Sequence, residues 1–459
     1  MLIPWGKLTL ILMFLLTSVS RADDWPQFRG PHRDGKSAET GLMKSWPAGG
    51  PQLLWSVKED LGKGYASLAI ANGMVYTTGM IDRDGFVFAF DLDGQLQWKQ
   101  NYGPEWTRAY PGTRTTPTIE GDRLYLTSGM GVVNCYHAKT GEKIWSADAN
   151  KDFQGQTVSW GWAESPLLVD DKVICTPGGK LATLVALDKM TGKVIWSTKE
   201  LSEKPAYCSP ILAPRGDRKI IVTQTAASLV GVDAANGKLL WQDNFNEWQG
   251  PRPGDINPPS QLYYDGAVYV TSGYDDGGAL VELSPDGSRA TRKWVDKTLD
   301  NHHGCVVLVE GYLYGSNWLS NEKGNWVCLE WNTGKVRYEH TWGPNHKGAV
   351  IYADGMLYCY NETTGELALV PPDPKQFNIV SSFKIPKSNE TIWWAHPALA
   401  DGRLYVRQGK DLFCYDIKEK SAASELDGNW TGTQPYGASG EWIAEISGNS
   451  CVFEGPSPD

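Results

Sequence analysis

Ten residues whose side chains could bind a ligand stand in one recurring place along this 459-residue chain, just ahead of a short apolar strand pattern. They combine aromatic faces, one guanidinium, carboxyl groups and imidazoles. Groups of these kinds converging on one rim would suit a planar anionic ligand or a sugar, through stacking and charged hydrogen bonds. For any single residue, loop packing or solvation is the better explanation, so the set as a whole is the candidate site. The ten residues are Arg114, Trp162, Glu164, Asn257, Asp300, His302, His303, His346, Trp394 and His396.

Familiar catalytic patterns do not occur in the sequence. There is no HExxH, no phosphate-binding glycine loop and no GxSxG elbow. His302 and His303 are adjacent, and on a strand they would point to opposite sides, so we do not expect them to hold one metal ion together.

The elements that must position these residues come from a repeated phrase. From Val185 to Trp196, alternating apolar residues lead to Asp188, Thr191-Gly192 supply a turn, and a second apolar strand follows. A single hairpin cannot bury its apolar face, but related phrases recur along the chain. Apolar pairs such as Val75-Tyr76 occur eight times, 44 to 49 residues apart. Eight units with room for four strands each predict an all-β, eight-bladed β-propeller of four-stranded antiparallel blades.

The two ends of the repeat array fit each other. The last unit stops after Leu412 to Asp416 without its tryptophan-bearing strand, whereas Leu53 to Trp55 is such a strand without the ones that should precede it. We expect this N-terminal strand to complete the last blade, because ring closure leaves no open sheet edge. An open β-solenoid is the alternative. The expected organisation is a signal peptide (1–22), an N-terminal extension (23–50), the propeller (51–420) and a tail with possible extra strands (421–459).

Small residues recur where the chain enters the innermost strand of each unit. Strands converge at the axis of a propeller, so a steric requirement is the expected reason. His396 is the exception to the pattern. The eight equivalent positions are Ser67, Thr116, Ser165, Ser209, Ser260, Cys305, Ala349 and His396.

Charge and the first residues bear on location and partners. The net charge is -10 with no Lys/Arg cluster, which argues against nucleic acid or an anionic membrane surface as a partner. Lys7, an apolar run from Leu8 to Val19 and the small residue Ala22 are typical of a cleaved signal peptide, and the run is short for a membrane span. We therefore expect an exported, periplasmic or secreted monomer with no transmembrane segment in the mature chain.

The chain has eight cysteines, without a CxxC motif or an adjacent pair. Five of them sit inside apolar strand patterns, where cysteine usually serves as a small buried side chain. We do not expect metal or redox chemistry from them. The five are Cys135, Cys175, Cys328, Cys359 and Cys414.

The repeated phrase resembles a known family. Val185-Ala186-Leu187-Asp188, followed by Thr191-Gly192-Lys193 and Trp196, is similar to the pyrroloquinoline quinone (PQQ) repeat, and the resemblance covers residues 51–416. That repeat builds the eight-bladed propellers of quinoprotein alcohol dehydrogenases and of BamB-type outer-membrane assembly factors. In it the tryptophan docks one blade on the next and does not touch the quinone. The leading segment Trp25 to Gly35 resembles exported PQQ-like propellers of planctomycete-type bacteria.

The resemblance makes PQQ and calcium possible cofactors. Quinoprotein dehydrogenases hold PQQ against an adjacent-cysteine disulfide, which this sequence lacks. They bind calcium through a glutamate and an asparagine beside a catalytic aspartate, and Glu164, Asn257 and Asp300 occur in that order. We expect a non-catalytic binding or scaffold protein of the cell envelope, with a protein partner, a small ligand or a glycan. The alternatives are a PQQ-dependent dehydrogenase of an alcohol or sugar, with Asp300 or Glu164 as base, and a glycan-binding propeller.

Overall fold

The computed structural model describes residues 24–247, 249, 256–386 and 393–419, and the backbone of three strands in the tail. The predicted signal peptide, residues 1–22, lies outside the described residues. Nearly every regular element in the described part of the chain is a strand. The two exceptions there are the short helix α1 (Ala149–Asp152) and the 3-10 turn η1 (Phe245–Glu247).

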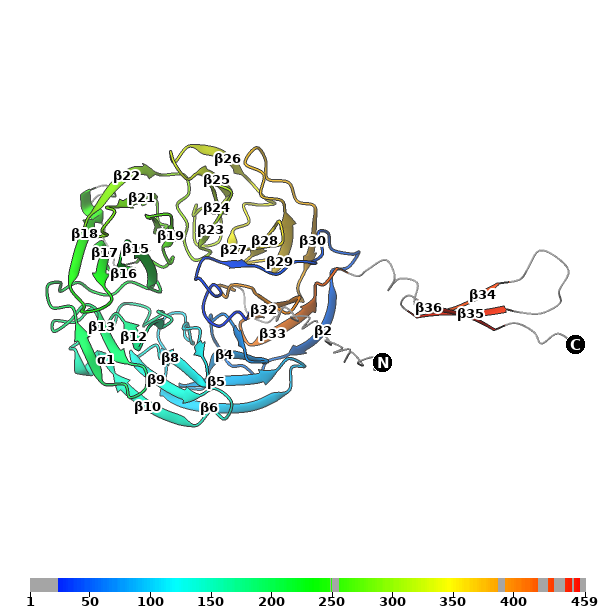
Figure 1. Cartoon of the computed structure of the whole chain (residues 1–459), viewed down its shortest axis with the longest axis horizontal. Coiled ribbons are helices and arrows are strands. Elements are labelled where there is room, and N and C mark those ends of the chain that lie inside the picture. Colours follow the sequence, from blue (N-terminus) through cyan, green and yellow to red (C-terminus); the bar gives the residue numbers. More distant parts are fainter. Residues whose placement is uncertain are drawn as a thin grey trace, which may run out of the picture.

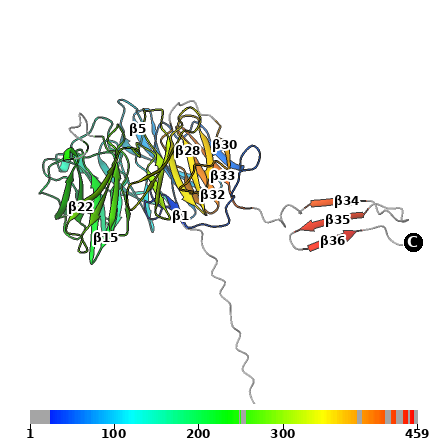
Figure 2. The ribbon, with the colours of Figure 1, turned by 90° about the horizontal axis from the view of Figure 1, so that it is seen from above.

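Eight sheets, each with four antiparallel strands, stand in a ring around a central axis, as Figure 1 shows from one face and Figure 2 from the side. Each blade runs from an innermost strand to an outermost one, so the predicted eight-bladed β-propeller is confirmed. Blade one consists of β3 (Ala69–Ala71), β4 (Met74–Ile81), β5 (Asp84–Asp91) and β6 (Leu96–Pro104), and blade two of β7 (Thr118–Glu120), β8 (Arg123–Thr127), β9 (Val132–His137) and β10 (Lys143–Asp148). Blade three consists of β11 (Leu167–Val169), β12 (Lys172–Cys175), β13 (Val185–Asp188) and β14 (Val194–Ser197), and blade four of β15 (Ile211–Arg215), β16 (Arg218–Gln224), β17 (Ser228–Asp233) and β18 (Leu239–Asn244).

The second half of the ring follows the same plan, with one extra strand in blade seven and one borrowed strand in blade eight. Blade five consists of β19 (Leu262–Tyr264), β20 (Ala267–Thr271), β21 (Gly278–Leu283) and β22 (Ala290–Asp296), and blade six of β23 (Val306–Val309), β24 (Tyr312–Ser316), β25 (Trp326–Glu330) and β26 (Val336–His340). Blade seven consists of β27 (Gly348–Ala353), β28 (Met356–Asn361), β29 (Glu366–Val370) and β30 (Ser381–Lys384), with β1 (Lys36–Ser37) as its extra strand. Blade eight consists of β31 (Ala398–Ala400), β32 (Arg403–Gln408) and β33 (Asp411–Asp416), with β2 (Gln52–Val57) as its borrowed strand.

Ring closure is made by the N-terminal strand β2. It pairs antiparallel with β33 in a register that sets Gln52 opposite Asp416 and Trp55 opposite Cys414. In Figure 1 the two strands lie side by side although they come from opposite ends of the propeller sequence. The predicted completion of the last blade by the strand at Leu53 to Trp55 is therefore confirmed, and the seam has no unpaired edge.

The repeat tryptophans dock each blade on the next. Trp145 Nε1 donates to the carbonyl of Lys189 at 3.1 Å, and its indole lies where a Cβ on Gly192 would stand, 2.6 Å from Trp145 Cε3. Gly192 has φ +72°, which suits the turn and leaves room for the ring. Asp188 completes the turn by accepting from the backbone N–H groups of Met190 and Thr191. The Asp, Gly and Trp of the repeat thus serve one contact between neighbouring blades.

The small residues at the innermost positions join blades through hydrogen bonds. Ser67 N–H donates to Thr116 Oγ1 at 3.0 Å, and Thr116 N–H donates to Ser165 Oγ at 2.9 Å. The relay continues to Ser209 at 2.9 Å and from there to Ser260 at 3.2 Å. The steric explanation was incomplete, because the hydroxyl groups also satisfy buried backbone donors.

The N-terminal extension threads the middle of the ring. Trp25 exchanges two 2.8 Å backbone hydrogen bonds with Ile70 of blade one, and β1 pairs in parallel with β27 of blade seven. Arg33, which is buried, donates to the carbonyls of Ser165 and Pro210 at 3.1 Å and also to that of Pro166. One short segment therefore ties several blades together at the axis.

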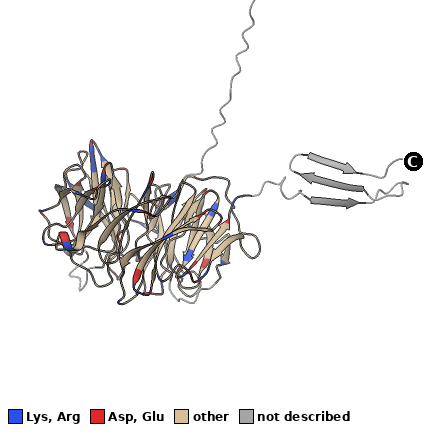
Figure 3. Ribbon diagram, turned by 90° about the horizontal axis from the view of Figure 1, so that it is seen from below, with Lys and Arg blue, Asp and Glu red and all other residues tan. Residues whose placement is uncertain are grey.

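Several other expectations concern the surface, the thiols and the tail. The seven cysteines with described side chains are free and buried. In the view of Figure 3, residues of both charges are scattered among uncharged ones. No helix of the described residues is long and apolar enough to cross a membrane. In the tail, β34 (Gly428–Gly432), β35 (Trp442–Ser447) and β36 (Ser450–Glu454) pair into a small antiparallel sheet of three strands, where we expected one or two.

Candidate functional site

A cavity of about 260 Å³ lies at the end of the central channel where the chain enters the innermost strands. Residues from many blades and from the N-terminal extension line it. Five of the ten predicted residues are among them: Arg114, His302, His303, Trp394 and His396. The remaining lining residues are Phe28, Tyr65, Tyr110, Trp160, Ala163, Ser165, Tyr207, Ser209, Ile256, Pro258, Tyr274 and Asn321.

Trp394 is the centre of an aromatic cluster in the cavity wall. Its ring centroid lies 4.9 Å from that of Tyr65, 5.2 Å from that of Tyr110 and 4.3 Å from that of His303. On blades three and four, Trp160 and Tyr207 form a second aromatic contact at 5.8 Å. Rings that brace one another in this way are held in place before any ligand arrives.

Arg114 is fixed by the loop that carries it. Nη1 donates to the carbonyl of Gly112 at 2.8 Å, Nη2 donates to that of Tyr110, and the guanidinium carbon lies 5.5 Å from the ring centroid of Tyr65. Burial lowers the pKa of Arg114 from its usual range, and the carboxyl of Glu105 is among the groups that oppose the shift. A guanidinium has five N–H donors, so donors remain for a ligand.

His302 and His303 lie side by side, which corrects the expectation that they would point to opposite sides. Their ring centroids are 3.6 Å apart, because both residues belong to a bend before β23 and not to a strand. His302 Nε2 is 2.7 Å from Tyr274 Oη. Burial is the largest cause that lowers the pKa of each imidazole well below its usual range, so both are neutral at physiological pH.

His396 joins the histidine pair to the floor of the cavity. Its Nε2 donates to the carbonyl of His303 at 2.8 Å, because a carbonyl oxygen can only accept. Burial lowers the pKa of His396 to about 3, and the ring is therefore neutral, with Nδ1 as its acceptor nitrogen. Phe28 of the N-terminal extension lies 5.0 Å from the His396 ring, so the extension forms part of the cavity lining.

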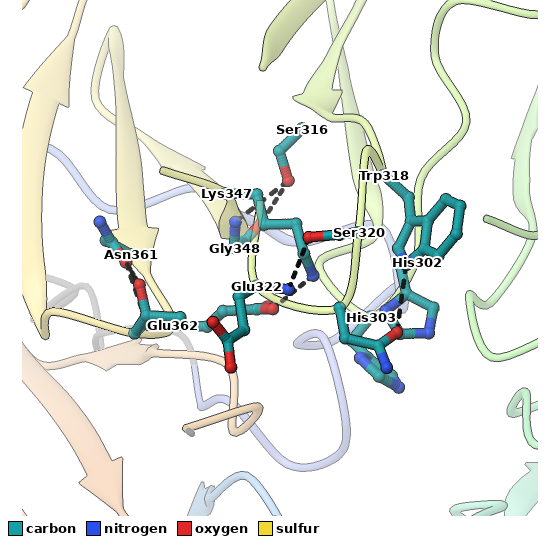
Figure 4. A network of polar contacts seen from close by, with 12 residues as sticks. His302, His303, Ser316, Trp318, Ser320, Glu322, Lys347, Gly348, Asn361 and Glu362 are labelled. Carbon is teal, nitrogen blue, oxygen red and sulfur yellow. Dashed lines mark hydrogen bonds and ion pairs between the residues drawn. The ribbon is translucent and has the colours of Figure 1, made fainter. Parts of the chain in front are cut away.

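A buried ion pair stands behind the histidines. Lys347 and Glu362 are each 2% exposed and pair through Nζ and Oε1, and Figure 4 shows them with the two histidines and the Ser316 to Glu322 stretch. Burial raises the pKa of Glu362 despite Lys347 and Trp394, which act in the other direction. Since the pair balances its own charge, it adds no net charge to the cavity.

Glu164 is buried away from the cavity lining. Burial raises its pKa to about 8, opposed by Thr176 and by the charge of Arg33, and Oε1 has no hydrogen-bond partner among the described residues. Its sequence neighbours Ala163 and Ser165 line the cavity, whereas its own side chain does not. The charge of Arg33, a residue of the N-terminal extension, acts on this carboxyl group, which is not part of the pocket lining.

The side chains of Asn257 and Asp300 form hydrogen bonds with residues of the surrounding loops. Asn257 donates to the carbonyl of Thr225 at 2.8 Å and accepts from Ser272 Oγ at 2.7 Å. Asp300 accepts from the backbone N–H groups of Asp275 at 2.6 Å and Gly277 at 2.8 Å. Burial raises the pKa of Asp300 to about 7. Neither side chain lines the cavity.

The fit of these residues to a calcium ion can be tested from their contacts. Calcium takes six to eight oxygen ligands, several of them from carboxylates. The oxygen atoms of Asn257 and Asp300 already accept hydrogen bonds, and the Glu164 carboxyl interacts with Thr176 and with the charge of Arg33. Among the described residues no group of three His, Cys, Asp or Glu side chains could hold a metal ion. The three predicted side chains do not fit a shared calcium site.

Trp162 and His346 are the other predicted residues that do not line the cavity. Trp162 is 3% exposed and packs in the core between blades two and three, beside Gly131. His346 lies 5.8 Å from Trp342, and burial lowers its pKa. Both are packing residues of their loops in this structure.

Sequence reasoning missed several lining residues. Tyr65 and Tyr207 stand in the same segments as the predicted residues, a few positions before an innermost strand, and could have been chosen on that ground. Tyr274 comes from the loop between β20 and β21, and Phe28 from the extension. No periodic signal marks those last two positions.

The geometry defines a PQQ-repeat propeller with an aromatic pocket at one end of its channel. The family model described as "Outer membrane protein assembly factor BamB" matches residues 83–339, more than half of the chain. The protein belongs to this family, and the predicted resemblance is confirmed.

Curated relatives include both enzymes and assembly factors. Polyvinylalcohol dehydrogenase of Sphingopyxis sp. (strain 113P3) is 28% identical over 327 residues, which are 66% of this chain and 46% of the relative. Outer membrane protein assembly factor BamB of Bordetella pertussis is 26% identical over 182 residues, 38% of this chain and 44% of the relative. The matches thus span less than half the length of these two proteins.

Solved structures show the same fold at low identity. BamB from Moraxella catarrhalis superposes with a TM-score of 0.59 at 14% identity, over 80% of this chain and 99% of that one. Quinohemoprotein alcohol dehydrogenase from Comamonas testosteroni gives a TM-score of 0.60 at 13% identity, over 90% of this chain and 83% of that one.

Proposed function

We propose that this protein is a non-catalytic binding protein of the cell envelope, whose pocket at the channel mouth takes a small ligand. The observation that carries the proposal is the composition of the pocket. Aromatic rings, Arg114 and neutral imidazoles line it, and no Asp, Glu or Cys of the described residues does. Such a wall can bind and orient a molecule, but it offers no carboxylate base and no anionic metal ligand.

The dehydrogenase alternative would need different chemistry at the same place. A calcium-assisted quinone reaction requires oxygen ligands around the ion and a base next to the substrate. Glu164 and Asp300, the predicted candidates for the base, are both absent from the pocket lining, and Asp300 accepts backbone hydrogen bonds from a loop. The pocket therefore supports binding more strongly than oxidation.

The glycan alternative would need aromatic faces open to solvent. The cavity-lining indole of Trp394 is instead in contact with Tyr65, Tyr110 and His303. The pocket favours a compact ligand over an extended sugar chain. Relatives described as outer membrane protein assembly factors support an envelope location and leave a protein partner as a second part of the proposal.

Calcium dependence of quinone binding tests the proposal. The mature protein is titrated with PQQ by calorimetry, with calcium chloride and with a chelator. We expect any binding of PQQ to be unchanged by calcium and by Glu164→Gln, Asn257→Ala or Asp300→Asn. Stoichiometric binding that needs calcium, and that Asp300→Asn abolishes, would contradict the proposal.

A further inference from the structure

The described residues that line the pocket include one cation and no carboxylate. Arg114 is a lining cation, and no carboxylate of the described residues lines the pocket beside it. The oxygens of Glu105, whose charge acts on Arg114, are occupied: Oε2 accepts from Tyr102 Oη at 2.7 Å and Oε1 from Trp106 N–H at 2.7 Å. A desolvated guanidinium with spare donors favours an anionic partner.

The histidines do not add charge to the pocket. His302, His303 and His396 are packed against aromatic rings, and burial keeps them neutral near pH 7. With the Lys347–Glu362 pair balanced, Arg114 is the charged side chain among the described lining residues, and the charge of buried Arg29 also acts on His396. The lining thus presents one guanidinium to a negative charge on a ligand.

Two hydroxyl groups strengthen this preference for hydrogen-bond acceptors. Ser165 Oγ accepts from Thr116 N–H at 2.9 Å, and Ser209 Oγ accepts from Ser165 N–H at 2.9 Å. Both serines line the cavity, and because their oxygens already accept, their O–H protons can be donated to a ligand.

The rest of the lining, Asn321 apart, consists of aromatic and aliphatic side chains. Tyr65 lies against the guanidinium and also contacts Trp394, and Phe28 of the N-terminal extension packs against His396. A volume of about 260 Å³ suits one or two fused rings. The extension therefore limits the size of the ligand as well as holding the ring together.

We propose that the pocket recognises a small planar ring compound bearing one carboxylate, which pairs with Arg114 while its ring packs on Trp394, Tyr65 and Phe28. This inference rests on the proposed function. It differs from recognition of PQQ, because PQQ is larger and carries several carboxylates that one guanidinium cannot balance.

Three naphthalene probes of the same shape and different charge test the proposal. The mature protein is titrated by calorimetry with naphthalene-2-carboxylate, the neutral naphthalene-2-carboxamide and the cationic 2-naphthylmethylamine. We expect the carboxylate to bind at least about tenfold more tightly than the amide, and the amine not to bind. Because the attraction is charged, affinity for the carboxylate should fall with added salt while that for the amide stays constant.

Arg114→Gln should lower affinity for the carboxylate to that for the amide and leave the amide unchanged. Arg83→Gln, which alters an exposed arginine outside the cavity lining, is the matched control and should behave as wild type. Equal affinity of wild type for carboxylate and amide, without salt dependence, would overturn the inference but leave the binding pocket standing. Failure of all three probes to bind would count against the pocket itself and hence against both proposals.

Discussion

The backbone N–H of His396 donates to Ser67 Oγ at 2.7 Å, and this hydrogen bond crosses the seam between blade eight and blade one. It extends the serine and threonine relay of the innermost strands to the point where the ring closes. The same residue, His396, lines the pocket. Closure of the ring and the shape of the binding site are therefore linked through one residue.

Removal of the seam hydroxyl should destabilise the ring. Ser67→Ala leaves the buried N–H of His396 without its acceptor, which typically costs about 1–3 kcal/mol. The urea midpoint should fall in this variant. Ser56→Ala, at an exposed serine of the closing strand β2, should leave the midpoint unchanged. Equal midpoints for the two variants would show that the seam bond does not contribute.

The contribution of blade docking to stability can be measured by comparing substitutions at two glycines of nearly equal φ. Gly192 (φ +72°) faces the indole of Trp145, whereas Gly73 (φ +75°) has nothing within 4 Å of an added Cβ. Both changes to alanine introduce the same backbone strain, about 1 kcal/mol. Only Gly192→Ala should also displace Trp145, so it should lower the thermal midpoint clearly more than Gly73→Ala. Similar losses would mean that the indole shifts at no cost.

Glu164 should make stability fall as the pH rises. Its folded-state pKa of about 8 lies above the ordinary value of 4.5, so the native state holds a proton that the unfolded chain releases. The associated stability is fully present below pH 4.5 and is lost as the pH rises toward 8. The free energy of unfolding of Glu164→Gln should therefore increase relative to that of wild type between pH 6 and pH 9, by about a few kcal/mol at most.

The control for this pH effect is Glu142→Gln, at an exposed glutamate. Urea midpoints of the three proteins are compared at several pH values across that range. A constant difference between Glu164→Gln and wild type would contradict the assigned proton.

The N-terminal extension should leave the channel when its anchor is removed. Arg33→Met deprives the carbonyls of Ser165 and Pro210 of their donor and leaves Glu164 without a nearby cation, whereas the carbonyl of Pro166 keeps Thr118 Oγ1 as a donor. Trypsin should then cut after Arg29, which is 2% exposed in the folded protein. Mass spectrometry would detect the cut. His32→Ala, at an exposed neighbour, should stay resistant, and equal resistance of Arg33→Met would show that the extension does not depend on this anchor.

The sequence was most informative where a physical constraint repeats. The Asp, Gly and Trp of Val185 to Trp196 each have one role in a turn or a blade contact, so their recurrence predicted the ring, and the orphan strand at Leu53 predicted its closure. The position of the pocket followed from the same alignment of blades. The position of the extension did not, because its contacts combine two arginine side chains bound to backbone carbonyls with isolated backbone pairings at Trp25 and β1, which leave no periodic trace.

Individual side-chain directions were harder to predict. Trp160 and Trp162 are two residues apart in one loop, yet the first lines the cavity and the second packs between blades. His302 and His303 come together because they lie in an irregular segment before β23, which the residue types do not indicate. Such directions depend on contacts between blades, which the local sequence does not contain.

The central claim is that this pocket binds without oxidising. The most direct test is dye-coupled oxidation of a panel of alcohols and sugars by the mature protein incubated with PQQ and calcium chloride. The account predicts no turnover above that of PQQ alone. Turnover that is lost in Asp300→Asn or Glu164→Gln, with the fold intact by circular dichroism, would contradict it and make the protein a quinone-dependent dehydrogenase.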